Sequence, residues 1–207
     1  MKLYYSPGTC ALAPHIVARE AGIPVELVKV DLNTKTVAEE GDYWAVNAKG
    51  YVPALGLDDG EVLTEGPAIV QYLADLVPAA RLAPANGTFA RVRLQEALNY
   101  ITAEIHKSYS PLFRPDVLPA VREERLSYLR KRYALLDRQL EGRKYLFGDT
   151  FTVADAYLFA VTRWARGVKL DLVEFPNLEA FQKRAGSRKA VLEALRAEGL
   201  IADSKAA

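Results

Sequence analysis

The sequence predicts an α/β domain followed by an all-helical domain, and three observations support this fold class. Residues 1–77 alternate between period-two and helical spacing of apolar side chains, which is typical of an α/β unit. Residues 78–87 follow neither period and contain two prolines and a glycine, so we place a linker there. Residues 88–207 carry apolar side chains at three- and four-residue spacing, which predicts helices.

The first domain is predicted to be a βαβ unit followed by a ββα unit. Strands are expected over residues 3–5 and 25–30, with a helix over 11–21 that ends at Gly22. Strands 54–57 and 61–63 form a hairpin around Asp58-Asp59-Gly60, because an Asp-Gly pair adopts the positive φ angles of a tight turn. A helix over 66–76 closes the domain.

The second domain is predicted to hold helices over 89–109, 117–140 and 153–166, and two shorter ones after Pro176. Thr152 and Asp155 suit a capping pair, in which both side chains accept hydrogen bonds from backbone N–H groups at the start of helix 153–166. We expect Asp155 to serve folding rather than chemistry. Tyr157, Phe159 and Trp164 recur at helical spacing, which indicates core positions.

Composition and charge argue against several functional classes. Twenty-seven basic and 26 acidic residues leave a net charge of +1, too small for a global field that gathers nucleic acid or an anionic membrane. The most cationic stretch, 122–132, is interleaved with Glu and Leu as in a solvated amphipathic helix. One cysteine and two histidines predict no internal disulfide and no metal site. Without a signal peptide or a long apolar segment, we expect a protein of the reducing cytosol.

Cys10 is the chain's one cysteine and the first candidate functional residue. It lies where the first strand ends and the first helix begins. A helix N-terminus carries unpaired N–H groups and a partial positive charge, which stabilise a thiolate. The alternative is a buried structural cysteine, a common role for this residue type.

Val52-Pro53 precedes the predicted hairpin and is the second candidate. A proline that enters an edge strand removes a ladder donor, and a cis bond there turns the backbone groups of Val52 outward, where they can pair with an extended peptide-like ligand. The alternative is a plain turn proline. The sequence leaves the cis or trans state open.

Thr64-Glu65-Gly66-Pro67-Ala68 follows a strand and opens a helix, and is the third candidate. Backbone N–H groups at that helix start can bind a carboxylate, and Glu65 can hold an ammonium group, so the segment suits the zwitterionic end of an amino acid. The alternative is an ordinary helix entry with Pro67 in the first turn.

These motifs resemble the bacterial beta class of cytosolic glutathione S-transferases over residues 1–201. The resemblance is carried by CALAPHI at 10–16, GYVPAL at 50–55 and LTEGPAIVQYLAD at 63–75, then by EIHK at 104–107, YSP at 109–111 and FTVADAYLF at 151–159. It implies a thioredoxin-like glutathione-binding domain over 1–77, a linker over 78–87, and an all-helical domain over 88–207 that supplies the electrophile site. It also implies a homodimer with glutathione as co-substrate and no metal.

The resemblance assigns roles to residues of the first domain. Cys10 is expected to face the glutathione sulfur and to be able to form a mixed disulfide with it. Val52 is expected to pair with the cysteinyl backbone of glutathione, and Glu65 and Gly66 to hold its γ-glutamyl end. Lys35 is expected to approach the glycine carboxylate.

In the helical domain, the resemblance implies that Asn99, Ala103 and His106 close the site and that Glu104 reaches toward the neighbouring subunit's ligand. Residues 109–114 and 164–167 are expected to shape the electrophile pocket. Ala11 and Ala13 stand where related sequences often carry serine, and Ala103 likewise offers no hydroxyl group. We therefore expect His106 and backbone N–H groups to do more of the thiolate stabilisation. We interpret the other histidine, His15, as a packing residue beside Pro14.

Glutathione transfer to small hydrophobic electrophiles is the leading functional hypothesis. A second hypothesis is that Cys10 itself reacts, in thiol transferase, peroxidase or reductive dehalogenase chemistry, with glutathione resolving the intermediate because a second cysteine is lacking. A third is a non-catalytic ligand binder. The presence of Cys10 and of the Glu65-Gly66 pair favours catalysis.

Overall fold

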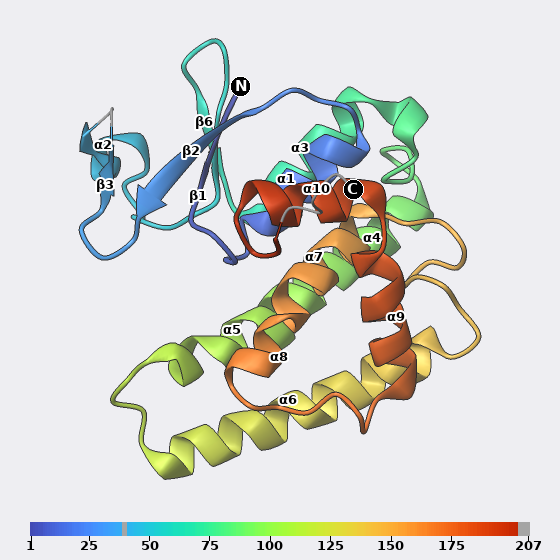
Figure 1. The fold of residues 1–207 in the computed structure, drawn as a ribbon. Coiled ribbons are helices and arrows are strands. Elements are labelled where there is room, and N and C mark those ends of the chain that lie inside the picture. Colours follow the sequence, from blue (N-terminus) through green and yellow to red (C-terminus); the bar gives the residue numbers. More distant parts are fainter. Residues whose placement is uncertain (39–40, 203–207) are drawn as a thin grey trace. The chain divides into compact units, whose positions relative to one another are not determined.

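The computed structural model describes residues 1–38 and 41–202, which group into two compact units (Figure 1). One unit comprises residues 1–83 with the segment that begins at residue 188, and the other comprises residues 84–187. The grouping departs from the predicted helical domain over 88–207 at its C-terminal end, because the last helix packs on the first unit. Residues 203–207 of that predicted domain lie outside the described residues.

The first unit is a mixed sheet with helices packed beside it. Over the described residues the strand order is β4-β3-β2-β1-β5-β6, with β1 parallel to β2 and antiparallel to β5. Its elements are β1 (Lys2–Tyr5), α1 (Leu12–Glu20), β2 (Glu26–Asp31), β3 (Thr36–Val37), β4 (Gly41–Asp42), α2 (Tyr43–Val46), β5 (Ala54–Gly56), β6 (Val62–Thr64), α3 (Gly66–Leu76) and η1 (Pro78–Ala80). The predicted βαβ and ββα units are confirmed, and β3, β4 and α2 are additional.

The predicted hairpin forms between β5 and β6, with Leu55 paired to Leu63. Gly60 has a φ of +92°, which agrees with the predicted role of the Asp-Gly pair in the turn. Leu3 of β1 pairs with Leu27 and Leu55 on the two sides, so the central strand is buried. The central strand β1 leads directly into the loop that contains Cys10.

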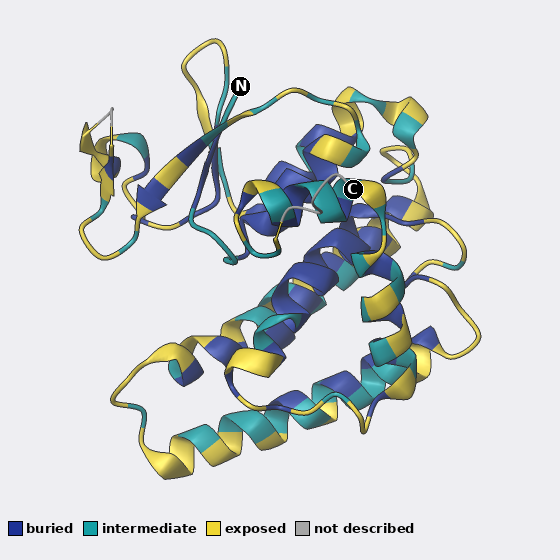
Figure 2. Cartoon of the chain, viewed as in Figure 1, coloured by how far each residue is buried: buried dark blue, intermediate teal, exposed yellow. Residues whose placement is uncertain are grey.

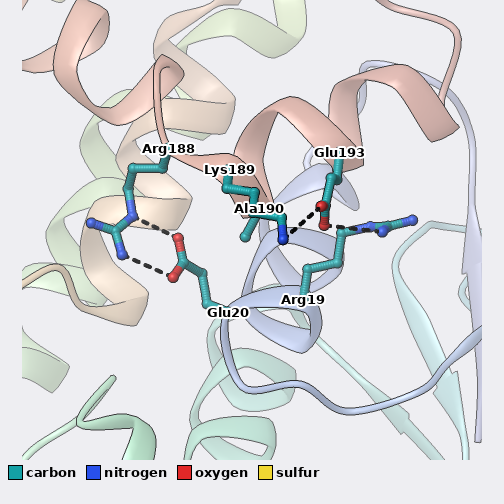
Figure 3. A pocket seen from close by; sticks show the side chains of 6 residues that line it. All are labelled: Arg19, Glu20, Arg188, Lys189, Ala190 and Glu193. Carbon is teal, nitrogen blue, oxygen red and sulfur yellow. Dashed lines mark hydrogen bonds and ion pairs between the residues drawn. The ribbon is translucent and has the colours of Figure 1, made fainter. Parts of the chain in front are cut away.

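The last helix, α10 (Lys189–Ala197), contacts α1 and buries Val191, Ala194 and Leu195. Arg188, which precedes it, holds the Glu20 carboxylate at the end of α1 with Nε and Nη2 at 2.6 and 2.8 Å, as Figure 3 shows. Apolar burial and this bidentate pair explain why the helix joins the first unit.

The second unit is all helical. Its elements are α4 (Phe89–Tyr100), the π-helical segment η2 (Ile101–His106), α5 (Lys107–Tyr109), η3 (Ser110–Phe113), α6 (Pro119–Leu140), α7 (Val153–Thr162), α8 (Trp164–Gly167) and α9 (Pro176–Gly186). Figure 2 shows α7 buried along its length, whereas α6 is buried on one side only. The cationic stretch 122–132 lies within α6.

The predicted helix 89–109 is helical throughout but not uniform, because π-helical turns occupy Ile101–His106. The Thr102 hydroxyl donates to the Leu98 carbonyl at 2.8 Å, and such side-chain bonds to the carbonyl four residues earlier bend helices. Isolated π-helical turns occur frequently at functional sites.

The predicted capping pair at the start of α7 is confirmed. Asp155 Oδ2 accepts from Thr152 N at 2.8 Å and from Thr152 Oγ1 at 2.7 Å, while Oδ1 accepts from Leu146 N at 2.8 Å. Tyr157 and Phe159 are buried as predicted, and Trp164 is partly exposed. In the part of the chain that the structure describes, no helix combines the length and the apolar character needed to cross a membrane.

Replacing Asp155 with alanine is expected to lower the free energy of unfolding by about 1–3 kcal/mol, because buried backbone donors lose their acceptor. Urea-induced unfolding measures the change. Asp149→Ala is the control, since its exposed contact with Lys144 contributes little. Equal losses for the two variants contradict the capping role.

The same carboxyl group predicts a pH dependence. Burial raises the pKa of Asp155 from 3.8 to about 6, so the folded state holds the proton more tightly than the unfolded state. Its contribution to the unfolding free energy therefore falls as the pH rises through this window. Asp155→Asn does not titrate there, so the stability gap between wild type and variant should narrow between pH 4 and 7 in urea titrations. A widening gap contradicts the assignment.

Candidate functional site

Cys10 lies in the loop between β1 and α1, directly before the N-cap residue Ala11. The loop is held by its own hydrogen bonds, in which the Thr9 hydroxyl donates to the Ser6 carbonyl at 2.7 Å and accepts from Ala11 N at 3.4 Å. The Cys10 side chain is 9% exposed, and its Sγ donates to the Val52 carbonyl at 3.4 Å. The structure thus brings together two predicted site residues that are 42 positions apart.

Val52 and Pro53 are joined by a cis peptide bond, which answers the question that the sequence leaves open. The preceding residue, Tyr51, is fixed through its carbonyl, which accepts from Tyr43 Oη at 2.8 Å and from Asn47 Nδ2 at 2.7 Å. These contacts hold the segment that enters β5 against α2. The Val52 carbonyl is thereby kept at the Cys10 sulfur.

Lys35 adopts a left-handed backbone conformation with a φ of +58°. Its Nζ donates to the Gly50 carbonyl at 2.9 Å and lies 5.9 Å from the centre of the Trp44 ring. Gly50 has a φ of +63°, and a Cβ there would lie 2.6 Å from the Trp44 ring, so only glycine fits. Lys35 is therefore directed back toward the GYVPAL segment.

Glu65 precedes α3 and also has a positive φ, +71°, which is uncommon for a residue with a side chain. Its carbonyl accepts from Ala68 N and Ile69 N at 3.0 Å, which completes the first turn that Gly66 opens. Its carboxylate is 65% exposed and contacts Lys49 Nζ at 2.7 Å. Backbone strain of this kind is typical of functional sites, where the surrounding structure enforces it.

In the helical unit, the His106 ring lies on η2 against aromatic side chains. Its Nδ1 is 2.6 Å from Tyr157 Oη, and its ring centre is 5.0 Å from that of Trp164. Trp164 also meets the rings of Tyr109 and Phe113 edge-on, at 5.6 and 5.4 Å between ring centres. Segments 109–114 and 164–167, predicted to shape a pocket together, are therefore in contact.

The other predicted residues of the helical unit differ in their surroundings. Asn99 and Ala103 are exposed on α4 and η2. The Glu104 carboxylate contacts Arg132 Nε at 2.8 Å and accepts from the Tyr128 hydroxyl. Glu104 thus has partners within its own chain, and its role toward a neighbouring subunit stays a prediction.

Two contacts of the candidate residues are not predicted by the sequence. Lys49, the partner of Glu65, sits in a loop and carries no motif signal that distinguishes it from other surface lysines. Tyr157 is predicted to be a core residue, and it is buried, but it also hydrogen-bonds His106. Its helical spacing with Phe159 and Trp164 predicts burial but gives no sign of the contact with His106.

Glu198 makes a buried network beneath the Cys10 loop. Its Oε2 accepts from Gly8 N at 3.0 Å, and its Oε1 lies 3.0 Å from His15 Nδ1. Arg19 Nε donates to His15 Nε2 at 2.9 Å, so Nδ1 carries the proton and donates to Glu198. His15 is therefore a buried connecting residue, in agreement with its predicted structural role. Burial and the Glu198 charge raise the pKa of Tyr5 at the end of β1.

A surface hollow between α1 and α10 is lined by Arg19, Glu20, Arg188, Lys189, Ala190 and Glu193 (Figure 3). Its charges already pair with one another, since Arg188 holds Glu20 while Arg19 and Lys189 both approach Glu193. These ion pairs therefore join the two helices, and they leave the hollow with little net charge that could attract a ligand.

Comparison with known proteins identifies two matching family models. The glutathione S-transferase N-terminal domain matches residues 8–76, and the glutathione S-transferase C-terminal domain matches residues 100–189. Among curated proteins, glutathione S-transferase GstA of Escherichia coli O157:H7 is 48% identical over 200 residues, covering 97% of this chain and 100% of that protein.

Solved structures give the same result. BphK, a bacterial glutathione S-transferase in a ternary complex, is 56% identical with a TM-score of 0.95, over 96% of this chain and 100% of BphK. A sphingomonad glutathione S-transferase complexed with glutathione is 44% identical, with a TM-score of 0.93, over 97% of this chain and 100% of that one. A bacterial beta-class enzyme of Sphingomonas chungbukensis is 44% identical, with a TM-score of 0.94 and the same coverage.

The network beneath the Cys10 loop predicts a stability effect. Glu198→Ala leaves the Gly8 and His15 donors without an acceptor and should lower the free energy of unfolding by about 2–4 kcal/mol, whereas Glu198→Gln keeps one oxygen and should cost less. Urea-induced unfolding measures both. Glu193→Ala is the control, since Glu193 lies on α10 before the C-cap residue Glu198 and its side chain is 38% exposed, and it should cost less than about 1 kcal/mol. Equal effects at positions 193 and 198 contradict the network.

Proposed function

Because the chain belongs to the bacterial beta class of glutathione S-transferases, we propose that it conjugates the glutathione thiolate to small hydrophobic electrophiles and that Cys10 can form a mixed disulfide with glutathione. Glutathione S-transferase activity follows from the family membership. The observation that carries the finer proposal is the contact between Cys10 Sγ and the Val52 carbonyl. It joins the candidate thiol to the backbone group expected to bind a peptide-like ligand.

We assign the binding of glutathione to the first unit. Glutathione is a tripeptide with two carboxylates and one ammonium group, and the sphingomonad relative is complexed with it. Val52 offers its backbone to the cysteinyl residue, in the manner of an added strand. Gly66, at the start of α3, and Glu65 suit the γ-glutamyl carboxylate and ammonium groups, and Lys35 suits the glycine carboxylate.

The contact between Lys49 and Glu65 bears on this assignment. The pair is exposed, so its own contribution to stability is small. Lys49 can follow Glu65 or turn to a ligand carboxylate at little cost, because the two side chains are 50% and 65% exposed. The pair thus leaves Glu65 available for an ammonium group.

From the helical unit, we propose that His106 stabilises the reacting sulfur and that Asn99, Ala103 and Glu104 contribute contacts, as the family pattern implies. The aromatic cluster of Tyr109, Phe113 and Trp164 suits an apolar electrophile. We further propose that the protein is a homodimer and works in the reducing cytosol.

The chemistry requires a thiolate, since the thiolate is the nucleophile. In conjugation, the thiolate of glutathione loses no further proton. Its sulfur forms a bond to the electrophilic carbon as the bond to the leaving group breaks. In the mixed-disulfide reaction, the Cys10 thiolate attacks oxidised glutathione, one S–S bond replaces another, and one glutathione thiolate leaves.

The mixed-disulfide reaction also supports the alternative function, in which Cys10 takes part in thiol transfer, peroxide reduction or reductive dehalogenation. The chain has a single cysteine, so glutathione must resolve the disulfide by attacking it. Retention on immobilised glutathione, and release by glutathione in solution, separates both enzymatic functions from a binder of unrelated ligands.

Intact-protein mass spectrometry tests the role of Cys10. After incubation with oxidised glutathione, wild type should gain about 305 Da, reversible by reduction, and Cys10→Ala should gain nothing. Conjugation of a haloaromatic compound is measured on the same samples. An unmodified wild type that still binds glutathione contradicts both the mixed disulfide and the alternative function, and conjugation that is retained in Cys10→Ala shows that the transfer does not need Cys10.

A further inference from the structure

The last helix, α10, ends in a cap that is well defined by its backbone hydrogen bonds. Gly199 has a φ of +70°, and its N–H donates to the Arg196 carbonyl at 2.8 Å. Leu200 N donates to the Leu195 carbonyl, also at 2.8 Å. These two bonds form a Schellman motif, in which a glycine reverses the chain at the end of a helix. The motif fixes the backbone of the C-cap residue Glu198 and of Leu200.

The side chains of Glu198 and Leu200 both contact Gly8, which lies two residues before Cys10. Glu198 Oε2 accepts a hydrogen bond from Gly8 N at 3.0 Å. Gly8 has a φ of +73°, and a Cβ at this position would lie 3.3 Å from Cδ2 of Leu200. The hydrogen bond therefore sets the direction of the Gly8 N–H, and the packing of Leu200 limits the movement of the loop toward α10.

The Glu198 side chain is fully buried, so its position depends on the groups that it binds. A carboxylate in the core is stable only where hydrogen-bond donors replace water. Gly8 N and His15 Nδ1, each at 3.0 Å, are such donors, and they lie on either side of Cys10 in the chain. Apolar side chains of α10 already pack the helix on α1, and the carboxylate adds a fixed direction to this contact.

The position of the Cys10 sulfur depends on the same loop. Thr9 N donates to the Ser6 carbonyl at 3.2 Å, so Gly8 lies inside a turn that leads directly to Cys10. Cys10 Sγ is 3.4 Å from the Val52 carbonyl that accepts its hydrogen bond. A rotation of the Gly8 peptide group would shift the residues that follow it, and the contact between the thiol and Val52 would change with them.

We propose that Glu198 is a positioning residue that holds the Cys10 loop in the conformation in which the thiol meets the Val52 carbonyl and reacts with glutathione. The inference rests on the proposed function of Cys10. Glu198 acts on the thiol through Gly8 and His15. Because Glu198 is 190 positions away from Gly8 in the sequence, the motifs around Cys10 give no sign of this role.

Hydrogen exchange of the full chain, followed by mass spectrometry of its peptides, shows whether Glu198 holds the loop. Loss of the acceptor of Gly8 N should speed exchange in peptides that cover residues 6–13 about tenfold in Glu198→Ala, as expected for the loss of one hydrogen bond. Glu198→Gln keeps one oxygen and should show a smaller increase. Glu193→Ala, which removes an exposed contact on the same helix, should show none.

Two reagents applied to the same variants separate positioning from simple exposure of the sulfur. Iodoacetamide needs only an accessible thiolate, whereas oxidised glutathione must also be aligned by the groups that bind it. The thiolate fraction enters both rates, so their ratio reports alignment. Intact-protein mass spectrometry gives both rates. Glu198→Ala should lower the ratio of the glutathione rate to the iodoacetamide rate roughly three- to tenfold, and Glu198→Gln should restore part of it.

Asp155→Ala is the matched control for stability, because it removes the cap of α7 in the other unit. It should leave the exchange of residues 6–13 and the ratio of the two rates unchanged. An equal fall of the ratio in Asp155→Ala and Glu198→Ala overturns the proposal, because general destabilisation then explains both. Unchanged exchange of residues 6–13 in Glu198→Ala overturns it as well.

The same measurements distinguish failure of this inference from failure of the proposed function. If wild type takes up no glutathione but Glu198→Ala still speeds exchange of residues 6–13 and alters the iodoacetamide rate, the proposed reaction of Cys10 fails and the hold of Glu198 on the loop stands. If wild type reacts with oxidised glutathione and Glu198→Ala keeps the same ratio of rates, the reaction of Cys10 stands and the positioning role of Glu198 is wrong.

Discussion

The buried carboxylate of Glu198 is the contact on which the arrangement around Cys10 depends. It accepts a hydrogen bond from Gly8 N, in the loop after β1, and it binds His15 on α1. One side chain therefore contacts the chain both before and after Cys10. Arg19 completes the network by bonding the other nitrogen of His15. Since buried donors without acceptors are costly, the loop, α1 and the C-terminal segment have to form together.

In the helical unit, the cap at the start of α7 likewise positions a residue that contacts the candidate site residue His106. Asp155 caps the buried helix α7, which sets where the helix begins and hence the positions of the residues that follow. Tyr157 occupies the next turn and bonds His106, a residue 51 positions earlier in the chain. Asp155 therefore has a structural role of its own and also determines that the Tyr157 hydroxyl is the group that contacts the His106 imidazole.

The start of α1 brings apolar side chains to the neighbourhood of Cys10. Ala11 and Ala13 are fully buried and bring no hydroxyl group to the start of α1. The Cys10 thiol donates to a backbone group, the Val52 carbonyl.

The sequence by itself determined the element order, the hairpin, the capping pair and the family, because these depend on periodicity, turn chemistry and short motifs that neighbouring residues carry. Only the tertiary structure decided that Cys10 meets Val52, that Glu198 holds Gly8, that Tyr157 bonds His106 and that the last helix packs on α1. Such contacts join residues far apart in the chain, and periodicity shows that a side chain is buried without showing which distant group it meets. The placement of a hydroxyl or carboxylate beside a candidate catalytic group is therefore a property of the packed core.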